Sequence, residues 1–272
     1  MFAASGRTRY AIIIPARYDS TRYPGKPLAE LRGASGVAKS LIRRSWEAAV
    51  EAAGADAVWV ATDDDRIAEA VAGFEGRVIL TSSACRNGTE RCAEAIAKIP
   101  DCPEIIVNLQ GDAPLTPSSI AGQLARTLDE EPAAAMATPA LRCSPSTFEH
   151  LEADARAGRV GGTTVVFDHA HRALYFSKSI LPYHPPGTNS AQANVHLHLG
   201  VYAYRRQALL DYAAAPASPI ELIEGLEQLR FLDRQMGVRI VPLDPLGWDC
   251  IELNNPSDVP AIEAVLRQRG IE

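Results

Sequence analysis

The chain of 272 residues lacks any apolar run long enough to cross a bilayer, and its first ten residues lack the apolar segment of a secretory signal peptide. We therefore expect a cytoplasmic protein with no membrane partner. Cysteines are few, and the five present are scattered without the short paired spacings of a zinc site. We interpret them as small buried side chains in a reducing compartment.

Clusters of positive charge are also missing. The formal net charge is -6, and the sequence has no basic tail or stripe. A protein that binds duplex nucleic acid needs clustered lysine and arginine to neutralise phosphates, so we expect no nucleic-acid partner. The sequence has neither a Walker loop nor the dinucleotide pattern G-x-G-x-x-G, and no Ser-His-Asp arrangement favours a covalent intermediate. Any nucleotide site in this chain would therefore use a different loop.

What is present is the composition of an ordinary globular protein, with 47% hydrophobic and 22% charged residues, which suits one large α/β domain. In the first half, short apolar runs typical of buried strands alternate with segments of helical spacing. The predicted strands cover residues 10–15, 57–61, 77–80 and 104–109, and the predicted helices cover 37–52, 64–74 and 88–99. Repeated units of this kind predict a Rossmann-like, mostly parallel sheet whose ligands bind at the carboxyl ends of its strands.

The second half contains strands of a more mixed character. They are predicted over residues 134–141, 162–168, 172–176, 195–204 and 238–241. Residues 219–236 have the apolar stripe of one amphipathic helix, and Pro256 opens a final helix after two asparagines that suit a cap. Residues 181–193 are rich in proline, glycine, asparagine and serine and predict a loop. We interpret residues 1–272 as one domain with an inserted mixed-strand subdomain at about residues 142–215.

The loop after the first predicted strand, residues 15–28, combines three cations with two hydroxyls and a glycine. Arg17, Arg22 and Lys26 can together surround a triphosphate. The alternative is a solvated polar loop. Confinement of these charges between a strand end and Pro24-Gly25 favours phosphate binding.

The same loop reads P-A-R-x-x-S-x-R-x-P-G-K-P-L and resembles the signature of the CMP-KDO synthetases, the 3-deoxy-manno-octulosonate cytidylyltransferases. Later segments resemble the family in the same order: N-G-T-E-R at 87–91, V-N-L-Q-G-D-A-P at 107–114, A-L-Y-F-S-K-S at 173–179, H-L-G-V-Y-A-Y at 198–204 and L-E-Q-L-R at 226–230. The resemblance implies a nucleotidyltransferase fold and transfer of CMP from CTP to a small acidic acceptor. It also implies Mg²⁺ as cofactor, a homodimer, and an acceptor-binding and dimerisation role for the insertion.

The resemblance further implies the roles of individual residues. Nucleotide contacts are expected from Pro15, Ala16, Arg17, Ser20, Arg22, Lys26, Asn87, Gly88, Thr89, Arg91 and Gln110, and acceptor contacts from Lys178, His198, Tyr202, Glu227 and Gln228. We expect Arg17, Arg22 and Lys26 to stabilise charge on the leaving group during direct displacement, and Asp112 to hold Mg²⁺. The alternatives are a glycine turn for Asp112, polar groups on a strand face for His198 and Tyr202, and a helical surface pair for Glu227 and Arg230.

Several positions depart from the family pattern. Ala113 replaces a glutamate, Thr164 replaces a lysine, and residues 33–36 read G-A-S-G where the family has G-K-P-M-I. Asn254 stands where the family has a second metal-binding aspartate, and it offers a neutral oxygen in place of a charged one. Either Glu252 or Asp249, the nearest acids in sequence, or the acceptor itself would then supply the missing charge.

The acceptor is left open by these departures. A KDO-type sugar acid and a phosphonate such as phosphonoformate are equally compatible with the residues, because a phosphonate binds metal through its own oxygens. A non-catalytic CTP-binding or regulatory homologue is the alternative from a different class. His196 shares a strand face with His198, but two histidines at this spacing are a poor metal signal without a third ligand.

Overall fold

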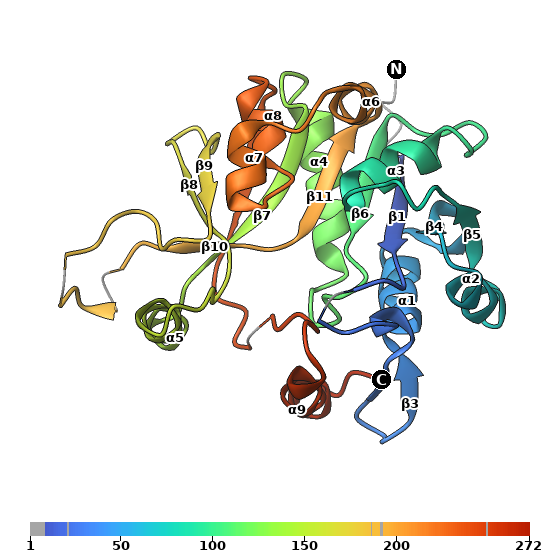
Figure 1. Ribbon diagram of the computed structural model, residues 1–272, viewed down its shortest axis with the longest axis horizontal. Helices are drawn as coiled ribbons and strands as arrows, with labels where there is room; N and C mark the ends of the chain where they lie inside the picture. The colour runs from blue at the N-terminus through green and yellow to red at the C-terminus, as the bar shows by residue number, and fades with distance from the viewer. Residues whose placement is uncertain (1–8, 21, 186, 191–192, 249) are drawn as a thin grey trace, which may run out of the picture.

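The computed structural model describes residues 9–20, 22–185, 187–190, 193–248 and 250–272. In this part of the chain, ten strands form one mixed sheet, and helices cover both of its faces (Figure 1). No helix of these residues is long and apolar enough to cross a membrane.

The first half of the chain forms a parallel sheet, as its alternating segments predict. Its strands are β1 (Tyr10–Ala16), β4 (Val58–Thr62), β5 (Arg77–Leu80) and β6 (Ile105–Leu109), and its helices are α1 (Leu41–Ala53), α2 (Asp65–Ala72) and α3 (Gly88–Ile96). β1 is central, because its Ile12 is paired with Val58 on one side and Val107 on the other.

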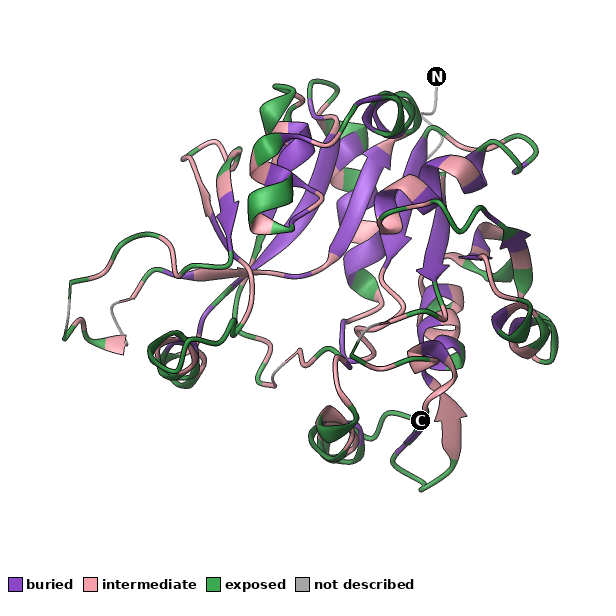
Figure 2. Ribbon diagram, in the orientation of Figure 1, coloured by how far each residue is buried: buried purple, intermediate pink, exposed green. Residues whose placement is uncertain are grey.

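Alternate residues of β1 pack against helices on opposite faces of the sheet. Ile12 and Ile14 belong to a buried cluster with residues of α1, α2 and α4 (Ser119–Glu130). Ile13 belongs to a second cluster with residues of α3 and α6 (Arg206–Ala214). Burial on both faces explains the continuous apolar runs of these strands. Figure 2 shows buried residues along the strands and exposed residues on the outer sides of the helices.

The second half extends the sheet with strands of both directions. These strands are β7 (Met136–Arg142), β8 (Thr164–Phe167), β9 (Ala173–Ser177), β10 (His196–His198), β11 (Val201–Arg205) and β12 (Val238–Leu243). The order is β5-β4-β1-β6-β11-β7-β10-β8-β9, and β12 pairs with β7 from its other side. Only β9, β10 and β11 run opposite to the other strands of the described sheet. The predicted Rossmann-like, mostly parallel α/β fold is confirmed.

Three predicted elements were wrong in their extent. The helix predicted over 219–236 is two short helices, α7 (Pro219–Glu224) and α8 (Leu229–Asp233), because Gly225 adopts a φ of 63° and ends the first. The strand predicted over 195–204 divides at Leu199 and Gly200 into β10 and β11, which pair with different parts of β7. The helix predicted from residue 37 starts later, because β3 (Ala38–Ser40) forms a hairpin with β2 (Glu30–Arg32).

The region expected as an insertion contributes directly to the sheet. β11 lies between β6 and β7, and the same region contains α5 (Pro145–Arg156), a helix absent from the sequence-based prediction. Helices α4 and α6 were also missed.

The C-terminal segment returns to the first half of the chain. This segment contains the 3-10 helix η4 (Pro256–Asp258) and the last helix, α9 (Val259–Arg269). Two other 3-10 helices, η1 (Lys26–Leu28) and η2 (Ala55–Ala57), lie in the first half of the chain. A small apolar cluster of Leu31, Leu41, Leu115, Leu253, Ile262 and Leu266 holds this segment in place. Asn255 forms a capping box with Asp258, as the predicted final helix requires.

A buried charge network joins α3 to the α7–α8 region. The Arg230 side chain is 1% exposed, and its Nε and Nη2 donate to both carboxylate oxygens of Glu221 at 2.7 and 2.6 Å. Nη1 and Nη2 also donate to Glu90 Oε1 at 3.2 Å, and the guanidinium lies 3.9 Å from the ring centroid of Tyr212. Arg230 is therefore a buried structural cation rather than the surface partner of Glu227 considered from the sequence.

Replacing Arg230 should cost more stability than replacing an arginine in a surface pair. Arg230→Met leaves two carboxylates without their buried partner, so we expect the free energy of unfolding to fall by about 3–5 kcal/mol. Arg267→Met is the control, because it removes only an exposed i,i+4 pair with Glu263 and should cost under about 1 kcal/mol. Urea unfolding measures both, and equal losses would contradict the structural role of Arg230.

Candidate active site

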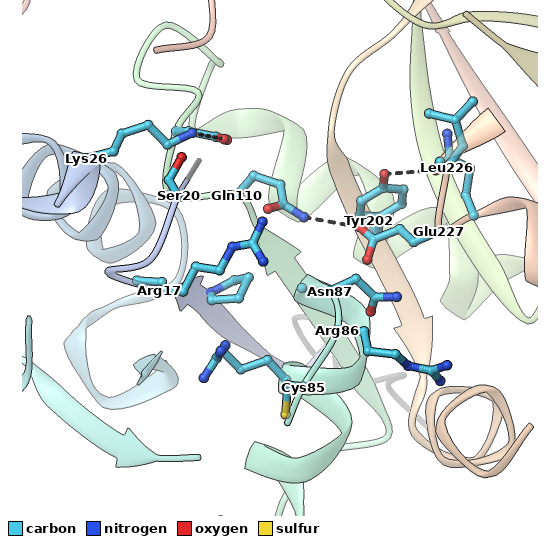
Figure 3. A pocket seen from close by; sticks show the side chains of 18 of the residues that line it. Arg17, Ser20, Lys26, Cys85, Arg86, Asn87, Gln110, Tyr202, Leu226 and Glu227 are labelled. Atoms are coloured by element: carbon cyan, nitrogen blue, oxygen red, sulfur yellow. Dashed lines mark hydrogen bonds and ion pairs between the residues drawn. The ribbon is translucent and has the colours of Figure 1, made fainter. Parts of the chain in front are cut away.

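A cleft of about 640 Å³ opens at the carboxyl ends of β1 and β6. The sequence-predicted residues that line it are Pro15, Ala16, Arg17, Ser20, Arg22, Lys26, Asn87, Gly88, Arg91, Gln110, Asp112, Tyr202, Glu227, Gln228 and Asn254. Figure 3 shows Lys26 and Ser20 on one side of the cleft and Tyr202 and Glu227 on the other, with Gln110 between them. The predicted residues Thr89, Lys178 and His198 are not part of the lining.

The cationic loop after β1 is closed on itself and anchored to α2. Gly25 has a φ of 72°, and its N–H donates to Tyr18 O at 2.9 Å. A Cβ on Gly25 would lie 3.0 Å from the Tyr18 ring, so only glycine fits this turn without a shift. The Arg66 guanidinium lies over the Tyr18 ring, 3.3 Å from the ring centroid, and Asp64 binds Arg66 at 2.6 Å. The loop is therefore fixed by the backbone hydrogen bond from Gly25 to Tyr18 and by the cation–π contact between Tyr18 and Arg66.

The loop, the turn after β6 and the C-terminal segment meet at one end of the cleft. Lys26 Nζ lies 2.7 Å from Asp112 Oδ2, and both side chains are largely buried. Arg22 Nη2 donates to Asn254 Oδ1 at 2.8 Å. The Leu253 N–H donates to Asp112 O at 2.8 Å and fixes the C-terminal segment beside the turn. The loop cations and the expected metal ligands are therefore direct neighbours.

The start of α3 forms a second wall. Asn87 caps the helix, since its Oδ1 accepts the Glu90 N–H at 2.8 Å, and its Nδ2 donates to Tyr212 OH at 3.0 Å. Gly88 sits so close to Gln110 that a Cβ would lie 3.0 Å from Gln110 Nε2. Thr89 faces away from the cleft: it is 1% exposed, and its hydroxyl lies 2.8 Å from Tyr204 OH.

Glu227, Gln228 and Tyr202 form the opposite wall. Glu227 accepts the Thr89 N–H at 3.0 Å and Gln110 Nε2 at 3.4 Å, while desolvation raises its pKa above the ordinary value. Tyr202 OH donates to Gln228 Oε1 at 3.5 Å. The buried Nε2 of Gln228 has no hydrogen-bond partner among the residues that the structure describes. This donor is thus available to an acceptor oxygen of a ligand.

His198 lies behind Tyr202. The Thr138 hydroxyl donates its only proton to Val201 O at 2.8 Å. His198 Nε2 lies 2.9 Å from the Thr138 hydroxyl oxygen, so Nε2 must carry a proton and donate it to that oxygen. Burial lowers the pKa of His198 to about 3. Its ring centroid lies 5.3 Å from that of Tyr202, which makes His198 a neutral support of Tyr202.

The two remaining predicted residues flank the cleft. Lys178 lies at its rim, because a Cβ on Gly225, a lining residue, would meet Lys178 Nζ at 2.9 Å. His196 packs edge-on against Phe167 with ring centroids 4.9 Å apart, and burial lowers its pKa. Hydrophobic packing therefore accounts for its position.

Sequence reasoning missed Arg86, which lines the cleft and binds Glu90 at 2.5 Å. Its position directly before the N-G-T-E-R segment was the available signal. Glu252 was named only as one of two nearby acids; its Oε2 accepts Asn254 Nδ2 at 3.3 Å. Desolvation and the charge of Asp112 raise the pKa of Glu252 to about 7. Asp249, the other acid, lies outside the described residues.

The oxygen donors at this end of the cleft suit a magnesium site that substrate and water complete, rather than a metal site made of protein ligands alone. Among the described residues, no group of three or more His, Cys, Asp or Glu side chains is placed to hold a metal ion. Mg²⁺ commonly binds through one or two carboxylates together with substrate phosphates and water. The carboxylate of Asp112 and the amide oxygen of Asn254 fit that requirement.

Known proteins resemble this chain in both sequence and structure. A family model described as cytidylyltransferase matches residues 11–240. A 3-deoxy-manno-octulosonate cytidylyltransferase of Maricaulis maris is 41% identical over 95% of this chain and 97% of its own length. The Zea mays protein of that name is 36% identical over 98% of this chain and 84% of its own. A structure of CMP:2-keto-3-deoxy-manno-octonic acid synthetase complexed with CTP matches with a TM-score of 0.80 and 34% identity, covering 96% of this chain and 99% of that one.

With these matches, the largely parallel sheet, the cationic loop after its first strand and the carboxylate after the neighbouring strand are those of a nucleotidyltransferase. Within that class, the chain belongs to the cytidylyltransferase family, since the family model covers most of its length. The resemblance to CMP-KDO synthetases drawn from the motifs is confirmed. The chain is therefore an enzyme of the cytidylyltransferase type.

Because the pKa of His198 is lowered in the folded protein, we expect the stability of the protein to depend on pH. Between pH 6.5 and about 3 the unfolded chain binds a proton at this ring that the folded chain does not. The contribution of His198 to stability is thus complete above pH 6.5 and is lost as the pH falls toward 3. We expect the stability of wild type relative to His198→Asn to decrease from pH 7 to pH 4.5 in urea unfolding. An imidazole of His198 that titrates near 6.5 in ¹⁵N NMR would contradict this.

Proposed function

We propose that this chain is a magnesium-dependent 3-deoxy-manno-octulosonate cytidylyltransferase that transfers CMP from CTP to KDO and releases pyrophosphate. The observation that carries the proposal is its similarity to curated proteins of that name, at 41%, 39% and 36% identity over 95%, 96% and 98% of this chain. The CTP complex of the structurally similar synthetase supports CTP as the nucleotide.

The loop after β1 suits the triphosphate of CTP. Arg17, Arg22 and Lys26 bring three cations to one side of the cleft, where the leaving pyrophosphate gains charge. The acceptor hydroxyl attacks the α-phosphorus in line, and the bond to the bridging oxygen breaks as pyrophosphate leaves. No side chain needs to form a covalent intermediate in this route.

Magnesium, when bound, supplies Lewis-acid polarisation of the α-phosphate. Asp112 and Asn254 are the residues that would hold it. In their present arrangement Lys26 and Arg22 bind those same two side chains. The cations and the metal ligands thus keep one another oriented at the phosphate end of the cleft.

The opposite wall suits an acidic sugar. Gln228 offers an unused buried donor, Tyr202 a hydroxyl, and Lys178 a cation at the rim. Gln110 and the turn at Gly88 lie between the two ends, where the cytosine would bind. A base held by fixed polar groups is discriminated because a wrong base leaves those groups unpaired. The expected homodimer remains a prediction, testable by sedimentation.

The other hypotheses raised by the sequence have less support. None of the curated relatives described above is named for a phosphonate acceptor. A non-catalytic homologue rested on Asn254 alone, and the cationic loop and Asp112 are both present in the cleft.

An acceptor assay tests the proposed function. The purified enzyme is incubated with CTP and Mg²⁺ and with either KDO or phosphonoformate, and the CMP conjugate is weighed by mass spectrometry. We expect CMP-KDO and pyrophosphate, formed only when Mg²⁺ is present. A conjugate with phosphonoformate alone would reverse our choice of acceptor, and the absence of any conjugate would support a non-catalytic protein.

Lys26→Ala should lower kcat by about 10²-fold, because it removes a fixed cation from developing negative charge. The control is Lys39→Ala in β3. Lys39 pairs with Glu47 at 2.7 Å and is not part of the cleft lining, so its loss should leave kcat within about twofold. Pyrophosphate release from CTP and KDO measures both variants. Equal rates for the two would exclude Lys26 from the chemistry.

A further inference from the structure

The C-terminal segment presents two side chains to the metal end of the cleft. Leu253 is fully buried, and its N–H donates to Asp112 O at 2.8 Å. The side chains of its two neighbours, Glu252 and Asn254, lie together, because Asn254 Nδ2 donates to Glu252 Oε2 at 3.3 Å. The anchor of Leu253 to Asp112 therefore brings a second carboxylate, that of Glu252, beside the first.

Glu252 lies at the edge of the cleft. A Cβ on Gly200 would lie 3.7 Å from Glu252 Oε1 and 3.4 Å from Gln110 Cγ, and Gln110 lines the cleft. Glu252 itself lines a second cavity of about 860 Å³, which shares Arg22 and Asn254 with the first. Its surface opens into this second cavity, so a hydrated cation can reach the carboxylate from that side.

Two cationic side chains bind the side-chain oxygens of Asp112 and Asn254, close to Glu252. Lys26 lies 2.7 Å from Asp112 Oδ2, and Arg22 lies 2.8 Å from Asn254 Oδ1. Their two positive charges balance the two carboxylates of Asp112 and Glu252. Both cations are also the groups expected to bind the triphosphate, so nucleotide binding would release the two oxygens for a metal ion.

We infer that Glu252 supplies the second metal-binding carboxylate in this chain, in place of the aspartate that Asn254 replaces. Mg²⁺ would be held by Asp112, Glu252 and the amide oxygen of Asn254, together with phosphate oxygens of the nucleotide. Two carboxylates are retained, with the second moved by two positions along the chain. The inference rests on the proposed function, because the nucleotide completes the metal site.

The test is the affinity for Mn²⁺, a paramagnetic substitute for Mg²⁺, measured by EPR in the presence of α,β-methylene-CTP. Glu252→Gln should weaken Mn²⁺ binding by about tenfold or more, because one charged ligand is lost. The double variant Glu252→Gln/Asn254→Asp should recover affinity to within about threefold of wild type, because it returns the carboxylate to position 254. Asp244→Asn is the matched control, with a side chain 88% exposed in a surface pair.

Three outcomes would decide the inference. Unchanged Mn²⁺ affinity in Glu252→Gln would overturn it, as would an equal loss in Asp244→Asn. A double variant that stays as weak as Glu252→Gln would also overturn it, provided that circular dichroism shows both to be folded. Failure of the proposed function is distinguishable: wild-type enzyme would form no CMP-KDO, whatever its Mn²⁺ affinity.

Discussion

The parallel pairing of β1 with β6 is the constraint on which the active site depends. Ile13 lies opposite Asn108, so both strands end at the same edge of the sheet. The loop after one strand carries Lys26, the turn after the other carries Asp112, and their contact at 2.7 Å follows from this register. A slip of one residue would turn every side chain of β1 to the opposite face and separate the two loops. Helices packed on both faces prevent that slip.

The two walls of the cleft are positioned by different kinds of interaction. The wall that carries the cationic loop is held by backbone pairing and by the turn at Gly25, which the cation–π contact of Tyr18 supports. The wall proposed to bind the acceptor depends on buried charge: Arg230 joins Glu221 to Glu90 and so fixes the segment that carries Glu227 and Gln228. A bidentate guanidinium can hold such a segment in one orientation because its donors lie in a rigid plane.

Much of this arrangement could be predicted from the sequence because its signals are local. The strands of the first half are apolar runs bounded by turns, and the motifs that follow them supplied most of the cleft lining. The break at Gly225 could not be seen, because the apolar stripe continues on both sides of it. The burial of His198 depends on its contact with the distant residue Thr138, and the position of Glu252 depends on the hydrogen bond between its neighbour Leu253 and Asp112. No local pattern reports such contacts.

The central position of β11 has a consequence for biosynthesis. β6 is buried along its whole length and apolar except for Asn108, yet its neighbour β11 leaves the ribosome only about ninety residues later, on the order of ten seconds of translation. Until then the backbone of β6 presents an open edge to which other chains can pair. The first half of the sheet therefore lacks one neighbouring strand until late in synthesis. Its completion is a late, non-local event, of the kind that slows folding and brings nascent chains to chaperones.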